Sequence, residues 1–182
     1  MEDNLNFKRP LSLRASSRVL VSLFALFAMV VALLPGPAYA ITTWVVMWSR
    51  AASQYVTANI SQTNAPLQAR ASAVGSWEEF TEVYVSTDST GERVIALRSQ
   101  ANGRYVSARL GQTDAPLEAR ATSVGSWEKF KIVGWADGSE SLWSVGAGKY
   151  VTARISQTNS PLQARADIVG SWERFDIYIS YS

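Results

Sequence analysis

The chain has 182 residues, of which 47% are hydrophobic and 18% charged, with a formal net charge of +2 and neither cysteine nor histidine. This composition is typical of a globular protein, and the length suits one domain with a short additional segment. The two missing residue types exclude a thiol nucleophile, a Ser-His-Asp triad, a zinc finger and a transition metal held by histidine.

The first 40 residues have the pattern of a secretory signal peptide. Four basic residues precede the run 19–34, whose only polar member is Ser22, and the small residues Ala38 and Ala40 follow. We expect cleavage after Ala40 and a secreted, extracellular product with no membrane partner. An uncleaved membrane anchor is the alternative, although the run is shorter than the ~20 residues that span a bilayer.

Cleavage would leave a domain without net charge. The first 40 residues carry four of the 17 basic and two of the 15 acidic side chains, so residues 41–182 carry 13 of each. A neutral domain lacks the basic excess typical of nucleic-acid binding, and we expect no nucleic-acid partner. Without cysteine, the secreted domain must be stabilised by packing rather than by disulfides.

Residues 41–182 contain one unit three times, at about 41–90, 91–137 and 138–182. Each unit has a Tyr-Val pair, a Pro-Leu pair, an Ala-Arg-Ala triplet and a Gly-Ser-Trp-Glu-x-Phe ending. The motif tryptophans are 50 and then 45 residues apart, which indicates a surface loop of variable length within 81–99. Units of this kind cannot bury their apolar residues alone, so we expect them to pack against one another.

The local pattern within each unit is that of β-strands. Apolar and polar residues alternate with period two, as in 67–71 and 175–180, and turn residues separate such runs. We expect four strands per unit: before the tyrosine, at it, after the proline and from the tryptophan onward. Twelve strands in three equivalent groups predict an all-β fold, the β-trefoil, whereas a propeller typically needs four or more blades.

The second unit carries the fullest set of motifs. It reads Asn-Gly-Arg-Tyr-Val-Ser-Ala at 102–108, Pro-Leu-Glu-Ala-Arg at 116–120 and Gly-Ser-Trp-Glu-Lys-Phe at 125–130. This series resembles the fascin-like β-trefoil repeat of secreted bacterial proteins, and the resemblance covers 41–182. The other units depart from it at the turn before the tyrosine. The resemblance implies a binding domain without catalysis, for polysaccharide or, in cytoplasmic eukaryotic members, for actin.

A polar segment lies between the tyrosine and the proline of every unit. It supplies Gln62 and Asn64, Gln112 and Asp114, and Gln157 and Asn159. Planar amides and carboxylates suit the neighbouring hydroxyl groups of a sugar, and we predict these six as ligand-binding residues. The alternative is a turn in which Asn and Asp bond their own backbone.

Two tryptophans break the threefold pattern. Trp48 and Trp143 occupy the position of Arg98 in the second unit. A core position would hardly accept both residue types, so we expect partial exposure. Because exposed indoles stack on pyranose rings, we also predict these two as ligand-binding residues. The alternative is that they cover one end of the barrel.

The Trp and Glu of the Gly-Ser-Trp-Glu-x-Phe ending recur in every unit, as Trp77, Trp127 and Trp172 and as Glu78, Glu128 and Glu173. The tryptophans would be the best platform for a sugar ring, but we expect them to pack in the shared core. We expect the glutamates to form structural ion pairs or hydrogen-bonded corners with Arg70, Arg120 and Arg165. Glycoside hydrolysis needs two carboxylates about 5 to 9.5 Å apart across one bond, whereas threefold copies would be spread around the axis.

We therefore predict a secreted, monomeric, lectin-like β-trefoil that binds a polysaccharide or other glycan through repeated shallow sites, with no catalytic residue, cofactor or metal. The alternative is a protein partner, as in an actin-binding or actin-crosslinking trefoil. Export and a content of only three lysines in 41–182 weigh against actin. A hydrolase would need an unrepeated carboxylate pair. We interpret the two available pairs, Asp88 with Glu92 and Asp137 with Glu140, as solvated turns beside glycine.

Overall fold

The computed structural model describes residues 43–181, which form twelve β-strands and include no helix that could cross a membrane. Six of the strands form the barrel described below: β1 (Thr43–Ser49), β4 (Phe80–Thr87), β5 (Arg93–Ser99), β8 (Phe130–Gly134), β9 (Glu140–Ser144) and β12 (Phe175–Tyr181). The others form hairpins: β2 (Gln54–Ala58) with β3 (Leu67–Ala71), β6 (Tyr105–Ala108) with β7 (Leu117–Ala121), and β10 (Lys149–Ala153) with β11 (Leu162–Ala166). A 3₁₀ turn, η1 (Ser171–Glu173), precedes β12. The predicted signal peptide lies outside the described residues.

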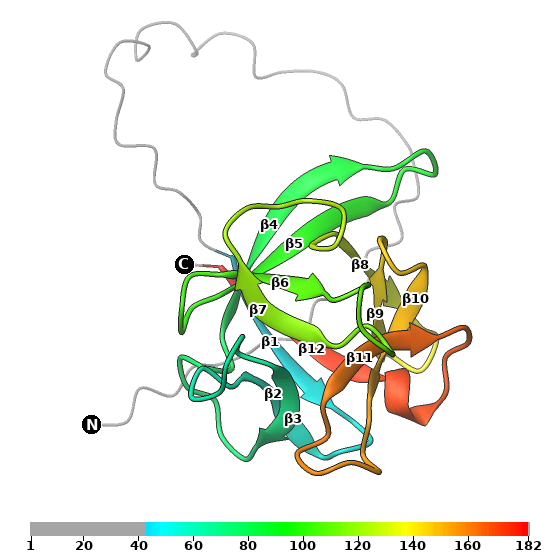
Figure 1. Cartoon of the computed structure of the whole chain (residues 1–182). Helices are drawn as coiled ribbons and strands as arrows, with labels where there is room; N and C mark the ends of the chain where they lie inside the picture. Colours follow the sequence, from blue (N-terminus) through cyan, green and yellow to red (C-terminus); the bar gives the residue numbers. More distant parts are fainter. Residues whose placement is uncertain (1–42, 182) are drawn as a thin grey trace, which may run out of the picture. The chain divides into compact units, whose positions relative to one another are not determined.

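Six strands close into an antiparallel barrel (Figure 1). β1 pairs with β4 and β12, β5 with β4 and β8, and β9 with β8 and β12. The first and last strands of the domain therefore share one ladder, in which Val45 lies opposite Ile179. Closure removes the free strand edges that an open sheet would expose to other chains.

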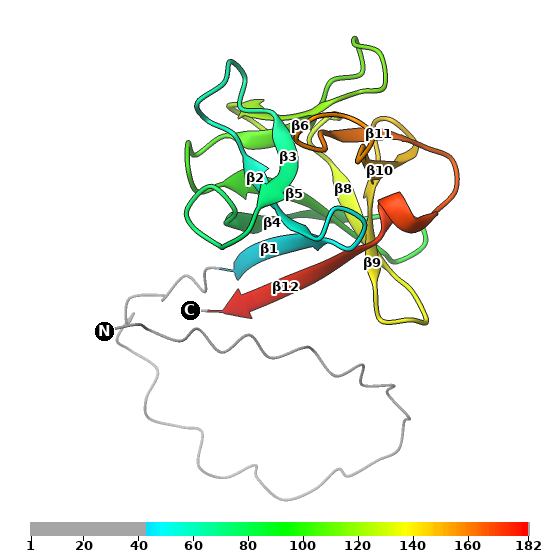
Figure 2. The ribbon, with the colours of Figure 1, turned by 90° about the horizontal axis from the view of Figure 1, so that it is seen from below.

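The three hairpins lie together on one side of the barrel and are linked in a ring (Figure 2). The residue before each proline accepts a hydrogen bond from the third strand of another unit: Ala65 O from Ala119 N at 2.9 Å, Ala115 O from Ala164 N at 3.0 Å, and Ser160 O from Ala69 N at 3.0 Å. Four strands per unit around a pseudo-threefold axis make this fold a β-trefoil, and the prediction of fold class is confirmed.

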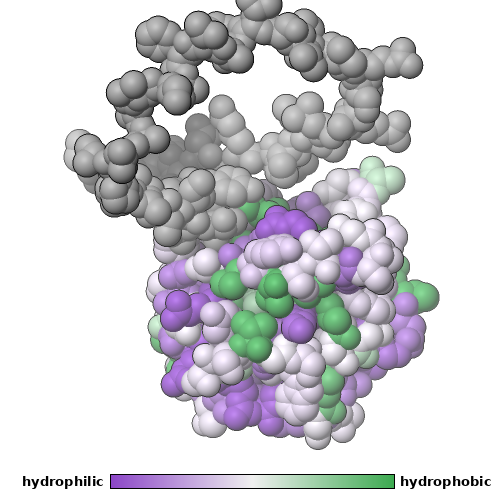
Figure 3. Space-filling view, turned by 90° about the horizontal axis from the view of Figure 1, so that it is seen from above, coloured by the Kyte–Doolittle hydropathy of each residue, from purple (hydrophilic) through white to green (hydrophobic). Residues whose placement is uncertain are grey.

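The units share one core. Its central side chains come from equivalent positions: Phe80, Phe130 and Phe175, Leu67, Leu117 and Leu162, and Val56, Val106 and Val151, none more than 1% exposed. Burying each such side chain contributes about 1.5–3 kcal/mol. Because every unit supplies a third of them, the core exists only when all three are assembled. The outer face shown in Figure 3, in contrast, mixes hydrophobic with hydrophilic residues.

Candidate functional site

The polar segments before the prolines form exposed turns. The Asn or Asp of each turn has a φ of 62° to 66°, and the residue after it also has a positive φ. Asn and Asp adopt this left-handed conformation more readily than other non-glycine residues, so they shape the turn. The glutamines of the three turns are exposed. The structure therefore assigns a turn role to Asn64, Asp114 and Asn159, and a ligand role for the six residues stays a prediction.

The turn of the first unit lines a hollow of about 510 Å³ at its border with the second unit. Gln62 and Asn64 come from the first unit, and Asn102, Arg104 and Arg120 come from the second. We call this space the boundary hollow. Two predicted residues therefore lie beside a cavity, together with arginines that the sequence did not single out for ligand binding.

At the next border the corresponding turn residue already has partners. The carboxylate of Asp114 lies 3.6 Å from Nη1 of Arg154 and 3.7 Å from Nη1 of Arg165, both in the third unit. These two arginines are equivalent to Arg109 and Arg120 of the second unit. A ligand that bound Asp114 would have to compete with these ion pairs.

Trp48 and Trp143 are half-buried at equivalent positions of β1 and β9, which confirms the expected partial exposure. Each contacts the tyrosine opposite it edge to face, with ring centroids 4.7 Å apart for Trp48 and Tyr55 and 4.6 Å apart for Trp143 and Tyr150. Neither tryptophan lines the boundary hollow or the second hollow described next. The structure thus does not bring them together with the polar turns.

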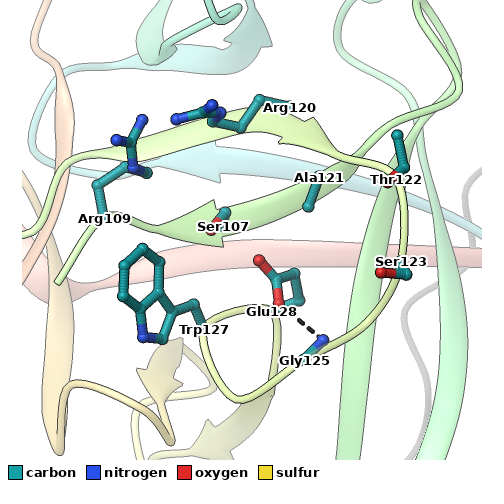
Figure 4. A pocket seen from close by; sticks show the side chains of 9 residues that line it. All are labelled: Ser107, Arg109, Arg120, Ala121, Thr122, Ser123, Gly125, Trp127 and Glu128. Carbon is teal, nitrogen blue, oxygen red and sulfur yellow. Dashed lines mark hydrogen bonds between the residues drawn. The ribbon is translucent and has the colours of Figure 1, made fainter. Parts of the chain in front are cut away.

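A second hollow, of about 540 Å³, lies beside Trp127 within the second unit (Figure 4). We call it the tryptophan hollow. Its walls come from β6, β7 and the loop that leads to β8, and they include Arg109, Arg120 and Glu128. The side chain of Arg120 lines both hollows, which are therefore neighbours. Trp127 itself is 38% exposed.

The expectation that the repeated tryptophans pack in the core is wrong. Trp77 and Trp172 are half-buried, and Trp127 is exposed. The main chain at these positions, rather than the indole, links the loop to the hairpin: Trp127 O accepts a hydrogen bond from Ala108 N at 2.9 Å. The phenylalanine three residues later fills the core instead. Threefold repetition indicates an equivalent environment for each copy, but that environment is a surface here.

The repeated glutamates form hydrogen-bonded corners, but not with arginine. Glu128 is 7% exposed and accepts a hydrogen bond from Gly125 N at 2.7 Å. Glu78 accepts from Gly75 N at 2.9 Å and from Thr57 Oγ1 at 2.7 Å. The expected pairing with the arginine of the Ala-Arg-Ala triplet is wrong, because these exposed arginines have other partners: Arg70 donates to Gln68, Arg120 lies near Glu118 and Arg165 lies near Asp114. The glutamates hold the loop before the fourth strand of each unit.

Two guanidinium groups border the tryptophan hollow. Nη1 of Arg109 lies 2.6 Å from Oε2 of Glu118, and Nη1 of Arg120 lies 3.8 Å from the same oxygen. Figure 4 shows the indole of Trp127 next to Arg109, and the carboxylate of Glu128 turned toward Gly125. An exposed indole can stack on the apolar face of a pyranose ring, while guanidinium groups donate hydrogen bonds to its oxygen substituents.

The unrepeated acidic residues stabilise turns, as expected. Asp88 accepts a hydrogen bond from Thr90 N at 2.8 Å and pairs with Lys131. Asp137 accepts from Ser139 N at 3.1 Å, and Arg174 lies 3.0 Å from it. Within residues 43–181, no group of three or more acidic side chains is arranged to hold a metal ion.

Known proteins share the fold of this chain at low sequence identity. No family model matches the sequence, and no curated protein is significantly similar to it. The designed threefold symmetric protein ThreeFoil matches with a TM-score of 0.64 and 13% identity, over 74% of this chain and 97% of that one. The agglutinin of Rhizoctonia solani matches with a TM-score of 0.62 and 12% identity, over 80% and 100%. An exo-β-1,3-galactanase from Clostridium thermocellum matches with a TM-score of 0.62 and 12% identity, over 76% of this chain but 30% of its own. This chain therefore has the β-trefoil fold, which lectins also have.

Proposed function

We propose that this protein is an exported, non-catalytic domain that binds polysaccharide. The observation that carries the proposal is the exposed indole of Trp127 in a hollow bordered by Arg109 and Arg120. Export rests on the pattern of residues 1–40. The motifs that resemble the fascin-like repeat of secreted bacterial proteins support the same role.

The two hollows offer complementary contacts to a sugar chain. In the tryptophan hollow, the indole supplies an apolar surface for one sugar ring. In the boundary hollow, which shares Arg120 with it, the amides of Gln62 and Asn64 offer hydrogen-bond donors and acceptors to hydroxyl groups. Each contact is modest by itself. A polymer that engages several of them gains affinity over a monosaccharide, because later contacts form at high effective concentration.

The Trp127→Ala variant tests the proposal. Loss of the stacking contact is expected to weaken binding about twofold to tenfold, since aromatic contacts are worth about 0.5–1.5 kcal/mol beyond their area. Calorimetric titration with β-glucan, xylan and chitin oligomers, and with acidic oligomers, measures the change. Tyr84→Ala is the matched control, because Tyr84 is 57% exposed on β4 and lines neither hollow.

A folded wild-type protein that binds none of these saccharides would contradict carbohydrate binding. A Trp127→Ala variant that binds as tightly as the wild type would contradict the role of the tryptophan hollow. Co-sedimentation with filamentous actin provides a separate arm, and retention on actin without retention on any polysaccharide would favour the protein-binding alternative.

A further inference from the structure

The border between the first and second units has an excess of positive charge. Arg104 and Arg120 line the boundary hollow, and Arg109 and Arg120 line the neighbouring tryptophan hollow of the second unit. Glu118 is the carboxylate that pairs with Arg109 and lies near Arg120. Arg104 is exposed and has no ion pair among residues 43–181. Glu128, the other carboxylate here, is buried in its main-chain corner.

At the border between the second and third units, each of the three equivalent cations lies near a carboxylate of the protein. Lys149, which corresponds to Arg104, pairs with Asp167. Arg154 and Arg165 both lie within 4 Å of the Asp114 carboxylate, which the preceding turn supplies. The chain thus contains its own example of an anionic group placed between this pair of guanidinium groups.

The first border lacks that anionic group. The turn residue equivalent to Asp114 is Asn64, whose amide is neutral. Asn64 lines the boundary hollow together with Arg104 and Arg120. Each arginine pair thus lies near one carboxylate, Glu118 at the first border and Asp114 at the next, but only at the first border does the third cation, Arg104, lack an ion pair among residues 43–181. The Asn64 amide can itself donate a hydrogen bond to an anion there.

We propose, on the basis of the proposed function, that this border selects acidic polysaccharide. An anionic substituent of the ligand binds to Arg120, Arg104 and the Asn64 amide. It is the counterpart of the Asp114 carboxylate at the next border. The neighbouring sugar ring then lies in the tryptophan hollow against Trp127. The chemistry shared by suitable ligands is an anionic group, a uronate carboxylate or a sulfate ester, on a pyranose chain.

A set of galactose-based oligomers tests this selectivity by calorimetric titration. The probes are oligogalacturonate, a sulfated carrageenan oligomer free of uronate, and a neutral galactan oligomer of similar length. The wild-type protein is expected to bind one of the anionic oligomers at least tenfold more tightly than the neutral one, and the preference should shrink as salt is added. The better anionic probe identifies carboxylate or sulfate as the preferred group.

Two reciprocal variants locate the site. Asn64→Asp gives the turn at the first border the carboxylate that Asp114 supplies at the second border. This variant should reduce the preference for the anionic oligomer about tenfold or more. Asp114→Asn makes the opposite change, and it should raise the number of anionic oligomers bound per chain from one to two. Arg120→Gln should lose the preference, whereas Arg165→Gln, its counterpart in the third unit, should keep it.

Each other outcome overturns the inference. Equal binding of neutral and anionic oligomers would refute acidic selectivity while polysaccharide binding stands. No binding of any saccharide by the folded protein, checked by near-ultraviolet circular dichroism, would refute the proposed function as well. Tighter binding to a single-stranded oligonucleotide of the same charge would assign the border to nucleic acid instead. An Asn64→Asp variant with unchanged preference would show that the anion binds elsewhere.

Discussion

Single residues decide where the backbones of neighbouring units can approach each other. A Cβ atom at Gly146, in the turn between β9 and β10, would lie 2.6 Å from the carbonyl oxygen of Ser126. At Gly134, near the end of β8, nothing lies within 4 Å of such an atom. The sequence alone does not distinguish the two glycines, and only the packing of the third unit against the second shows which one is sterically required.

The Gly146→Ala variant is expected to lose about 1–3 kcal/mol of unfolding free energy, because the added methyl group must displace main chain. Gly134→Ala is the control and should change stability by less than about 1 kcal/mol. Urea denaturation of both variants measures the difference. Equal losses would show that the close approach at Ser126 is not the cause.

The β4–β5 hairpin accounts for the longer spacing between the first two motif tryptophans. A loop of variable length was expected within 81–99, and the segment is instead mostly strand, with a turn between Thr87 and Arg93. Figure 1 shows this hairpin extending from the body of the domain. Asp88 and Glu92 at its turn both pair with Lys131 of β8. The sequence indicated the length difference but not this anchoring, because the partner belongs to a later strand.

Replacing Lys131 by Met tests the anchoring. The hydrogen bond from the Lys131 ammonium, with further hydrogen bonds from Thr90 and Glu92, holds the pKa of Asp88 well below its ordinary value of 3.8. A lowered pKa means that this contribution to stability is complete above pH 3.8 and is lost as the pH falls through the folded-state pKa. In Lys131→Met the pKa of Asp88 should rise toward 3.8, as measured by carboxyl NMR titration. Lys129→Met should leave it unchanged, and a similar rise there would contradict the assignment.

We expect the whole domain to unfold as one cooperative unit, since its barrel is closed by β1 and β12 and its core receives equivalent side chains from every repeat. A chain of autonomous repeats would behave differently, because each would unfold by its own interactions and those with its nearest neighbours.

Truncating Phe130, which is fully buried, should therefore destabilise all three units together. We expect Phe130→Ala to cost about 3–5 kcal/mol and to keep a single unfolding transition. Tryptophan fluorescence reports on every unit and circular dichroism on all strands, so coincident curves in urea are the expected result. Separate transitions would indicate that the units fold independently. Tyr84→Ala, an exposed site, serves as the control and should change stability little.

The sequence by itself determined the class of fold. Alternating residues in three copies of one unit can be buried only around a common axis, and the twelve strands follow from this local pattern. Only the tertiary structure decided what the surfaces of the units do where they meet. The exposure of Trp127, the hydrogen bond from Thr57 to Glu78 and the different surroundings of Asn64 and Asp114 all depend on residues from other strands or other units. Spacing along the chain specifies which residues are equivalent, but it does not specify which of them face each other across a border, because those contacts form only when the barrel closes.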